Sequence, residues 1–460
     1  MAVGPDGALI VGGEFFTNTF AGGAAAVRVG RWDGTAWQAR GASVNAPVRV
    51  LARGADGAMI AGGEFTGAGG AGALRVARRT AEGWSALAGN VTGTVVNALA
   101  VAPDASVYVG GQFTQAGGQS ASNVARWTGS AWQPLGVGVL GVVRAAAVAP
   151  DGTLYVGGSF TLAGGAAAAK VARWSGGAWQ PLGAGITGGA AVVLAAVVGP
   201  DGALYVGGEF TTAGGAPASN VARWTGTAWQ PLGAGTDGRV HALAFSSAGT
   251  LYAGGAFTAA GGAPASRVAR WTGTAWQPLG EGVNLPVLAF TKAGNDAMYV
   301  AGEFTSAGGA AASRIAYWSG SAWSPLDNTI SGTVYALALD ATGSLVVGGD
   351  FQTGGTVYSP YITRYELIPV AAESVPETPA LALRVGPNPT RGTATAWLAA
   401  PSGPATVSVY DALGRQVGTA DVAAGQTLVA LPTAGLAPGI YVVRLATSSG
   451  VQTARLVVAQ

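Results

Sequence analysis

The sequence predicts an all-β fold, a β-propeller followed by a small Ig-like β-sandwich. The stretch GGEFTTAGGAPASNVARWTGTAWQPLG at Gly207–Gly233 recurs almost letter for letter at Gly254–Gly280, and related copies fill most of the chain. Each copy has four short β-like runs, with no helical periodicity between them. The second tryptophans of the copies are spaced 47 to 50 residues apart, a period typical of propeller blades. They are Trp37, Trp84, Trp132, Trp179, Trp229, Trp276 and Trp323.

One unit illustrates the four expected strands. They are Val240–Phe245, Thr250–Phe257, Arg267–Trp271 and Ala275–Gly280. Turn-forming residues separate the strands of such units, as in GPDG at Gly199–Gly202. The layout is similar to kelch-type and WD-type propellers, although the diagnostic dipeptides of neither family are present.

The glycine pair that precedes most G-x-F phenylalanines and the two tryptophans of a unit are interpreted first as packing residues. Glycines let a neighbouring sheet approach closely, and large aromatic side chains bury much apolar surface. A single unit has too little core to be stable alone, so the repetition supplies each blade with neighbours. An aromatic platform for carbohydrate is the alternative.

The number of blades depends on how the ends of the array combine. Eight G-x-F elements occur, but the first unit lacks most of its first strand and the last lacks its W-x-P-L strand. An incomplete first and last unit could complete one another, so eight blades are favoured, with seven as the alternative. Because the sequence opens inside a repeat, we expect the full-length protein to begin upstream of Met1.

The repeat pattern ends near Tyr365, which sets the expected domain boundaries. Residues 1–365 are assigned to the propeller, the Pro- and Glu-containing residues 366–380 to a linker, and residues 381–460 to the β-sandwich.

Residues 381–460 resemble the C-terminal sorting domain of proteins exported by the type IX secretion system. The resemblance rests on GPNPTRG, VSVYDALGRQV, LAPGIYVVRL and the terminal RLVV. It implies a bacterial cargo that the type IX secretion machinery carries across the outer membrane and that is then released or attached to the cell surface. The sorting-motif residues that it implies are Pro387, Asn388, Pro389, Gly414, Pro438, Gly439 and Tyr441.

Composition argues against several classes of function. The 24 Lys and Arg nearly balance the 22 Asp and Glu, and no basic cluster occurs, so nucleic acid is not an expected partner. There is no Cys and only one His, His241, which leaves no thiolate or His-rich metal site. We expect no metal, no cofactor, no transmembrane segment and a monomer.

Acidic residues offer a candidate for catalysis. The residue before the G-x-F phenylalanine is often acidic, and such carboxylates could bind a cation or form a glycosidase pair. The favoured interpretation pairs them with the arginines of the A-R-W element, and treats the aspartates of the PDG turns as turn formers. The acids are Glu14, Glu64, Glu209, Glu303 and Asp350, the arginines are Arg31, Arg78, Arg223 and Arg364, and the turn aspartates are Asp6, Asp104, Asp151 and Asp201.

Two classes of function remain open. We expect a secreted or surface-attached propeller without enzymatic activity that binds a glycan or a surface protein. The alternative is a secreted polysaccharide hydrolase or lyase that uses carboxylates. No unit carries the unlike insertion that an active site usually requires, which favours the binding module.

A binding site is predicted where the copied units differ. The residue entering the first strand varies while the residues after it stay apolar, and first strands of propellers line a central channel. These residues are Arg49, Asn97, Arg144, Leu194, His241, Pro286 and Tyr335, beside the loop residues Asn90, Asp237, Arg239, Glu281 and Asn284. The alternative is sequence drift at exposed strand ends.

Overall fold

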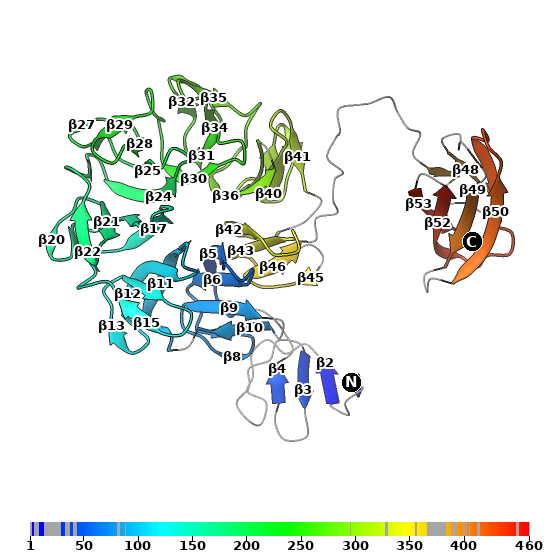
Figure 1. The fold of residues 1–460 in the computed structure, drawn as a ribbon, viewed down its shortest axis with the longest axis horizontal. Coiled ribbons are helices and arrows are strands. Elements are labelled where there is room, and N and C mark those ends of the chain that lie inside the picture. The colour runs from blue at the N-terminus through cyan, green and yellow to red at the C-terminus, as the bar shows by residue number, and fades with distance from the viewer. Residues whose placement is uncertain are drawn as a thin grey trace. The chain divides into compact units, whose positions relative to one another are not determined.

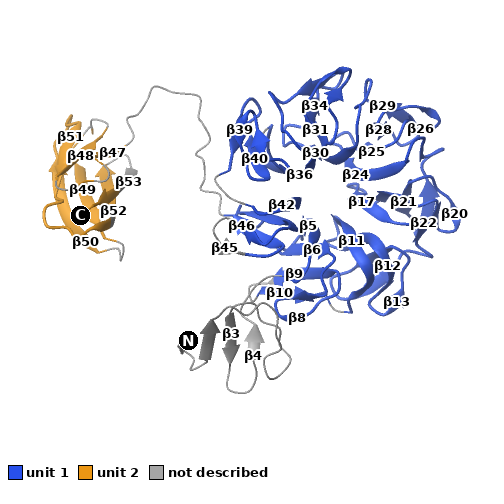
Figure 2. Ribbon diagram, turned by 180° about the vertical axis from the view of Figure 1, so that it is seen from behind, with its two compact units in different colours: residues 1–367 blue, residues 368–460 orange. Residues whose placement is uncertain are grey.

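The structure is a computed structural model in which the chain forms two compact units, Met1–Leu367 and Ile368–Gln460 (Figure 2). It describes residues 44–459, and before them the strands β1 (Ala2–Val3), β2 (Leu9–Gly12), β3 (Val29–Trp32) and β4 (Trp37–Ala39). The gaps within 44–459 are 81–82, 88, 295, 327–329, 355–356, 366–382, 388–389, 391–392, 399–400, 402, 404, 412–414 and 448–449. Among the described residues no helix is long and apolar enough to cross a membrane.

Seven antiparallel sheets follow one another through residues 44–365, each built from consecutive strands in the order predicted for one repeat. The innermost strands are β5 (Val48–Arg53), β11 (Val91–Val101), β17 (Val143–Val148), β24 (Val192–Val198), β30 (Val240–Phe245), β36 (Val287–Gly294) and β42 (Thr333–Leu339). The second strands are β6 (Met59–Gly63), β12 (Val107–Ala116), β18 (Leu154–Gly158), β25 (Leu204–Glu209), β31 (Leu251–Gly255), β37 (Ala297–Gly302) and β43 (Leu345–Asp350).

The third and fourth strands lie farther from the centre of the ring. The third strands are β9 (Val76–Thr80), β14 (Val124–Trp127), β21 (Val171–Ser175), β28 (Val221–Trp224), β34 (Val268–Trp271), β40 (Ile315–Trp318) and β46 (Ile362–Tyr365). The fourth are β10 (Gly83–Ala86), β15 (Trp132–Pro134), β22 (Ala178–Pro181), β29 (Trp229–Pro231), β35 (Trp276–Pro278) and β41 (Trp323–Pro325). The sheet of β42, β43 and β46 has three strands in the described residues.

Two-residue strands decorate the loops between the main strands. They are β7 (Gly67–Ala68), β8 (Ala71–Gly72), β13 (Gln119–Ser120), β16 (Val139–Leu140), β19 (Leu162–Ala163), β20 (Ala166–Ala167), β23 (Ile186–Thr187), β26 (Thr212–Ala213), β27 (Ala216–Pro217), β32 (Ala259–Ala260), β33 (Ala263–Pro264), β38 (Ser306–Ala307), β39 (Ala310–Ala311), β44 (Thr353–Gly354) and β45 (Val357–Tyr358).

The seven sheets close into a ring (Figure 1). Each innermost strand packs against the innermost strand of the next sheet, and β42 packs directly against β5. One apolar cluster joins Val48 and Met59 of the first of these sheets to Ala338 and Val346 of the last. The prediction of eight blades is therefore not confirmed. The incomplete end units do not complete one another either, because β1–β4 form a sheet of their own.

The repeated glycine pair has two separate steric causes. A Cβ added to Gly157 would lie 2.3 Å from Cγ1 of Val193 in the next sheet. A Cβ added to Gly158 would lie 2.0 Å from the carbonyl oxygen of Val142 in the same sheet. The first glycine therefore makes room for the neighbouring blade, and the second makes room for the backbone of the innermost strand.

Tryptophan side chains form hydrogen bonds between successive sheets. In five of the seven described sheets two tryptophans pair, as Trp224 and Trp229 do with ring centroids 5.4 Å apart. The indole Nε1 of Trp229 also donates a hydrogen bond of 2.8 Å to the carbonyl oxygen of Leu182 in the preceding sheet. Trp179, Trp276 and Trp323 make the corresponding bonds. Packing between sheets thus accounts for these residues.

The second unit is built from two antiparallel sheets around one core. One sheet contains β47 (Arg384–Gly386), β48 (Ala394–Trp397) and β51 (Leu428–Leu431). The other has the order β50 (Gln416–Val422), β49 (Ala405–Tyr410), β52 (Gly439–Thr447) and β53 (Gly450–Val458). Alternating residues of β49, such as Val407 and Val409, are buried, as expected for a strand with one face toward a core.

Candidate functional site in the central channel

Every innermost strand of the ring contains a β-bulge at the same place. In β5, Val48 lies opposite Gly63 and Val50 opposite Gly62, so Arg49 between them has no partner on β6. The same shift leaves out one residue in each of the other six strands. The seven bulged residues are Arg49, Asn97, Arg144, Leu194, His241, Leu288 and Tyr335. Bulges redirect side chains and are frequent next to functional sites.

All seven bulged residues line one cavity of about 200 Å³, the central channel. The structure thereby brings together Arg49, Asn97, Arg144, His241 and Tyr335, the five first-strand residues proposed as ligand-binding from the sequence. The prediction of Pro286 for this position in the sixth sheet is wrong, because Leu288 occupies the bulged position of β36. The signal that identifies Leu288 is the preceding valine and following alanine, Val287 and Ala289, which the other units share in similar form.

Arg49 is held by groups of its own surroundings. Its guanidinium makes an ion pair of 2.5 Å with Glu64, at the end of β6, and its Cζ lies 4.1 Å from the ring centroid of Tyr335. Burial alone would lower the pKa of Arg49, but the hydrogen bond and the charge of Glu64, together with Tyr335, raise it. Since Tyr335 belongs to β42, this contact lies where the last sheet meets the first.

Arg144 and His241 are in different electrostatic environments. Among the described residues, the Arg144 side chain has no hydrogen bond or ion pair, and it is exposed to the channel. Burial lowers the pKa of His241, the positive charge of Arg239 lowers it further, and Glu209 partly opposes both. His241 is therefore neutral at pH 7. Asn97 donates a hydrogen bond of 3.2 Å to the carbonyl oxygen of Val143.

The loop residues predicted to flank the channel do not line it. Asp237 accepts hydrogen bonds from the backbone N–H groups of Thr258 (2.7 Å) and Ala259 (2.8 Å). Asn284 accepts the corresponding hydrogen bonds from the N–H groups of Thr305 and Ser306. Asn90 accepts a hydrogen bond from the N–H of Leu74.

The remaining two loop residues, Arg239 and Glu281, are also absent from the channel lining. Arg239 is paired with Glu209. Glu281 is exposed in an outer loop, where one of its carboxylate oxygens lies 2.8 Å from the position that a Cβ on Gly309 would occupy. These residues are therefore loop-forming or rim residues rather than channel residues.

The predicted pairing between the G-x-F acids and the A-R-W arginines is wrong. In β25 and β28, Tyr205 lies opposite Arg223, so Arg223 is near the PDG turn and Glu209 is at the far end of the strand. Arg223 accordingly pairs with the turn residue Asp201 at 2.6 Å. Arg78–Asp56, Arg126–Asp104 and Arg364–Asp340 repeat this ion pair. Four of the described turn aspartates thus also form ion pairs with arginines of the third strands.

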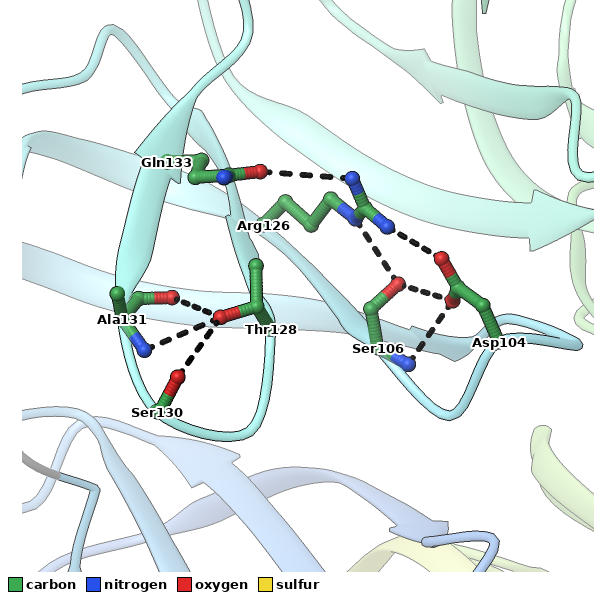
Figure 3. Close-up of polar contacts among 7 residues, drawn as sticks. All are labelled: Asp104, Ser106, Arg126, Thr128, Ser130, Ala131 and Gln133. Carbon is green, nitrogen blue, oxygen red and sulfur yellow. Dashed lines mark hydrogen bonds and ion pairs between the residues drawn. The ribbon is translucent and has the colours of Figure 1, made fainter.

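Figure 3 shows one such cluster, which joins the turn between β11 and β12 to β14 and β15. Arg126 pairs with Asp104, donates from Nε to Ser106 Oγ at 3.0 Å, and reaches Gln133 at 3.4 Å. Ser106 donates back to Asp104 from both its N–H and its hydroxyl, so the carboxylate is already bound on several sides. Glu14, Asp6 and Arg31 lie outside the residues whose side chains are described.

The described residues contain no group of three or more His, Cys, Asp or Glu side chains placed to hold a metal ion. Two of the G-x-F acids, Glu64 and Glu209, each contact an arginine.

The residues of the sorting motif are only partly described. Tyr441 is buried in the sandwich and its hydroxyl donates a hydrogen bond of 2.8 Å to the carbonyl oxygen of Ala437. Gly439, which follows Pro438, begins β52 and pairs with Val458 at the end of β53. Pro387 follows a cis peptide bond. Asn388, Pro389 and Gly414 lie outside the described residues.

Comparison with known protein families matches two parts of the chain. Residues 384–459 match the model of the secretion system C-terminal sorting domain. Residues 102–128, 149–173 and 199–224 match a domain of unknown function (DUF5122) described as a beta-propeller. A search of curated proteins finds no match.

Several solved structures are similar at low identity. The extracellular domain of a hybrid two-component system from B. thetaiotaomicron is 10% identical, with a TM-score of 0.43 over 100% of this chain and 69% of that one. The WD40 beta propeller domain of Doa1 is 14% identical, with a TM-score of 0.46 over 70% and 93%. A fungal alcohol oxidase of the AA5 family is 12% identical, with a TM-score of 0.42 over 90% and 98%.

Proposed function

We propose a function on the premise that the chain carries β-propeller repeats and ends in a type IX secretion sorting domain, so that it is a bacterial protein secreted or attached to the cell surface. The proposal is that its propeller is a binding module without enzymatic activity, and that the ligand enters the central channel. The type IX secretion machinery is its partner during export.

One observation carries the proposal. Seven bulged side chains, one from each sheet of the described ring, converge on a single cavity. The valine before each of them is the same in all seven sheets, yet the bulged residues include two arginines, an asparagine, a histidine, a tyrosine and two leucines. Chemical variety confined to one position of a uniform scaffold is typical of a binding surface.

The architecture that we propose has seven blades in residues 1–365, a linker in 366–380 and the sorting domain in 381–460. Deletion of residues 381–460 is expected to abolish export from a host with a type IX system, while the thermal transition of the propeller is retained. Loss of that transition in the truncated protein would contradict the proposal that the propeller folds independently of the sorting domain.

The absence of enzymatic activity is also part of the proposal. Glycosidases need one carboxyl group free to donate a proton and a second free to attack or to activate water. In this chain Glu64 and Glu209 are instead engaged by Arg49 and Arg239, and Glu303 and Asp350, which form no ion pair among the described residues, do not line the channel. We expect no turnover of polysaccharides by the purified protein. Turnover that is lost in Glu209→Gln or Glu303→Gln would overturn this part.

A plugged channel tests the binding site without knowledge of the ligand. Leu194→Trp adds an indole to a wall of the 200 Å³ cavity and leaves every polar lining residue in place. Leu285→Trp is the matched control, since Leu285 is 42% exposed and outside the channel. Full-length protein and both variants would be applied to arrays of glycans and of surface proteins. We expect signals that Leu194→Trp abolishes and Leu285→Trp preserves; equal signals from both variants would contradict the site.

A further inference from the structure

The two arginines of the central channel differ in one respect that points to a ligand. Arg49 is neutralised by Glu64, whose N–H bonds to the carbonyl oxygen of Pro47. In the sheet that carries Arg144, the residue with the same backbone bond is Ser159, which donates to Val142. The acid that would neutralise Arg144 is therefore absent from its own blade, and the guanidinium is without a partner among the described residues.

The surroundings of Arg144 do not supply a compensating charge. No carboxylate is among the residues that line the channel, and Glu209, at the end of β25 in the adjacent sheet, is paired with Arg239. Glu303 and Asp350, at the ends of β37 and β43, belong to sheets three places away from the Arg144 sheet in either direction around the ring. The low pKa of His241 keeps that side chain neutral at pH 7. Arg144 is thus the uncompensated charge of the channel wall.

Asn97 places a second polar group beside Arg144. Its Nδ2 is tied to the carbonyl oxygen of Val143, the residue before Arg144, which holds the amide next to the base of the arginine. An amide and a guanidinium on adjacent walls are suited to the oxygens of a carboxylate or a sulfate, because charge-assisted hydrogen bonds from arginine to such groups are strong.

We propose that the central channel binds a carboxylate or sulfate group of a small ligand through Arg144, with Asn97 as a neighbouring donor. This inference rests on the proposed function and specifies its ligand chemistry. The cavity of about 200 Å³ is smaller than the roughly 300–1,000 Å³ typical of small-molecule sites, so it accepts one sugar-sized unit rather than a polymer chain.

Calorimetric titration of the full-length protein tests the proposal with three probes: D-glucuronate, sodium sulfate and D-glucose. We expect binding of glucuronate that weakens at about 0.15 M salt, and no binding of glucose. Arg144→Gln is expected to weaken glucuronate binding about tenfold to a hundredfold. Arg173→Gln is the matched control, because Arg173 is in the same sheet, bonds to Gln180 and does not line the channel. Thermal melts verify that both variants are folded.

The outcomes separate this inference from the proposed function. Sulfate binding as tight as glucuronate binding supports the anion site and identifies the anion, not the sugar, as the recognised part. Absence of binding by both anions, or glucuronate binding unchanged in Arg144→Gln, overturns the anion site. The proposed function would survive that result if Leu194→Trp still abolished array binding, and would fall if it did not.

Discussion

Two neighbouring positions on each innermost strand of the ring have opposite properties. The first is valine in all seven sheets and is 0% exposed, because its methyl groups fill the space left by a glycine or, once, by Ala301 of the preceding sheet. The second is the bulged residue, which faces the central channel and is chemically different from sheet to sheet. The valines are Val48, Val96, Val143, Val193, Val240, Val287 and Val334.

A different physical constraint acts on each of these two positions. Close packing between sheets admits one shape, so the same residue recurs at every interface. A side chain that projects into the channel has no such neighbour, and its identity can be set by a ligand. Repetition in this chain therefore identifies the scaffold, and local variation identifies the candidate site.

The largest expected effect comes from crowding the backbone of an innermost strand next to its bulge. In Gly158→Ala the new Cβ would lie 2.0 Å from the Val142 carbonyl oxygen, and backbone atoms cannot rotate away. We expect the free energy of unfolding to fall by about 3 kcal/mol, at the upper end for overpacking. Gly72→Ala, where nothing lies within 4 Å, should change it by less than about 0.5 kcal/mol. Equal urea midpoints for the two variants would contradict the steric account.

A smaller difference in unfolding free energy is expected between two neighbouring residues of β24, one at the interface between sheets and one in the channel wall. Val193→Ala removes two methyl groups from a fully buried contact and is expected to cost about 2 kcal/mol of unfolding free energy. Leu194→Ala removes more carbon atoms, but from a half-buried channel wall, and should cost less than about 1 kcal/mol. Denaturant unfolding of both variants provides the test, and a larger loss for Leu194→Ala would reverse the assignment of the two positions.

The smallest effect concerns the ion pairs near the turns between the first and second strands. Burial alone would raise the pKa of Asp340, but hydrogen bonds from Thr342, Ser344 and Arg364 outweigh it and lower the pKa from 3.8 to about 2. A lowered pKa in the folded state means that ionised Asp340 stabilises the fold above pH 3.8, and that this contribution is lost as the pH falls through about 2.

Asp340→Asn is therefore expected to destabilise the ring by about 0.5–1 kcal/mol at neutral pH, with the difference from the parent protein shrinking as the pH falls below 3.8. Urea midpoints across that pH range measure it. Asp151→Asn is the control, since Asp151 accepts hydrogen bonds from Thr153 and has no ion pair among the described residues. A constant difference between Asp340→Asn and the parent at all pH values would contradict the assigned role.

The sequence predicts the repeated sheets well because each unit carries the same turn and strand signals. It also predicts which strand lines the channel, since the bulged residues Arg49 and Tyr335 are polar between apolar neighbours. The sequence does not identify Leu288 as a channel residue, because it is apolar like the residues around it. A strict two-residue alternation cannot indicate a bulge, and only the second glycine of each pair hints at it.

Two other features depend on three-dimensional register. Glu209 and Arg223 are near one another in the sequence, yet antiparallel pairing sends them to opposite ends of the sheet, so spacing alone misassigns the ion pair. Ring closure depends on whether β42 meets β5 directly, which repeat counting leaves open between seven and eight blades.

A disulfide between the first and last sheets would show whether the two ends of the array share one channel. A Cβ on Gly57 would lie 3.3 Å from Cβ of Ala341, close to the roughly 3.5–4.5 Å of a disulfide, and the chain has no other cysteine. We expect Gly57→Cys with Ala341→Cys to form an intramolecular disulfide under mild oxidation, detected by mass spectrometry and a shift in a non-reducing gel. Gly57→Cys with Ser247→Cys, in the turn before β31, should remain reduced. An additional sheet between β42 and β5 would separate the first pair by about 10 Å, and failure of that pair to cross-link would contradict the seven-sheet channel.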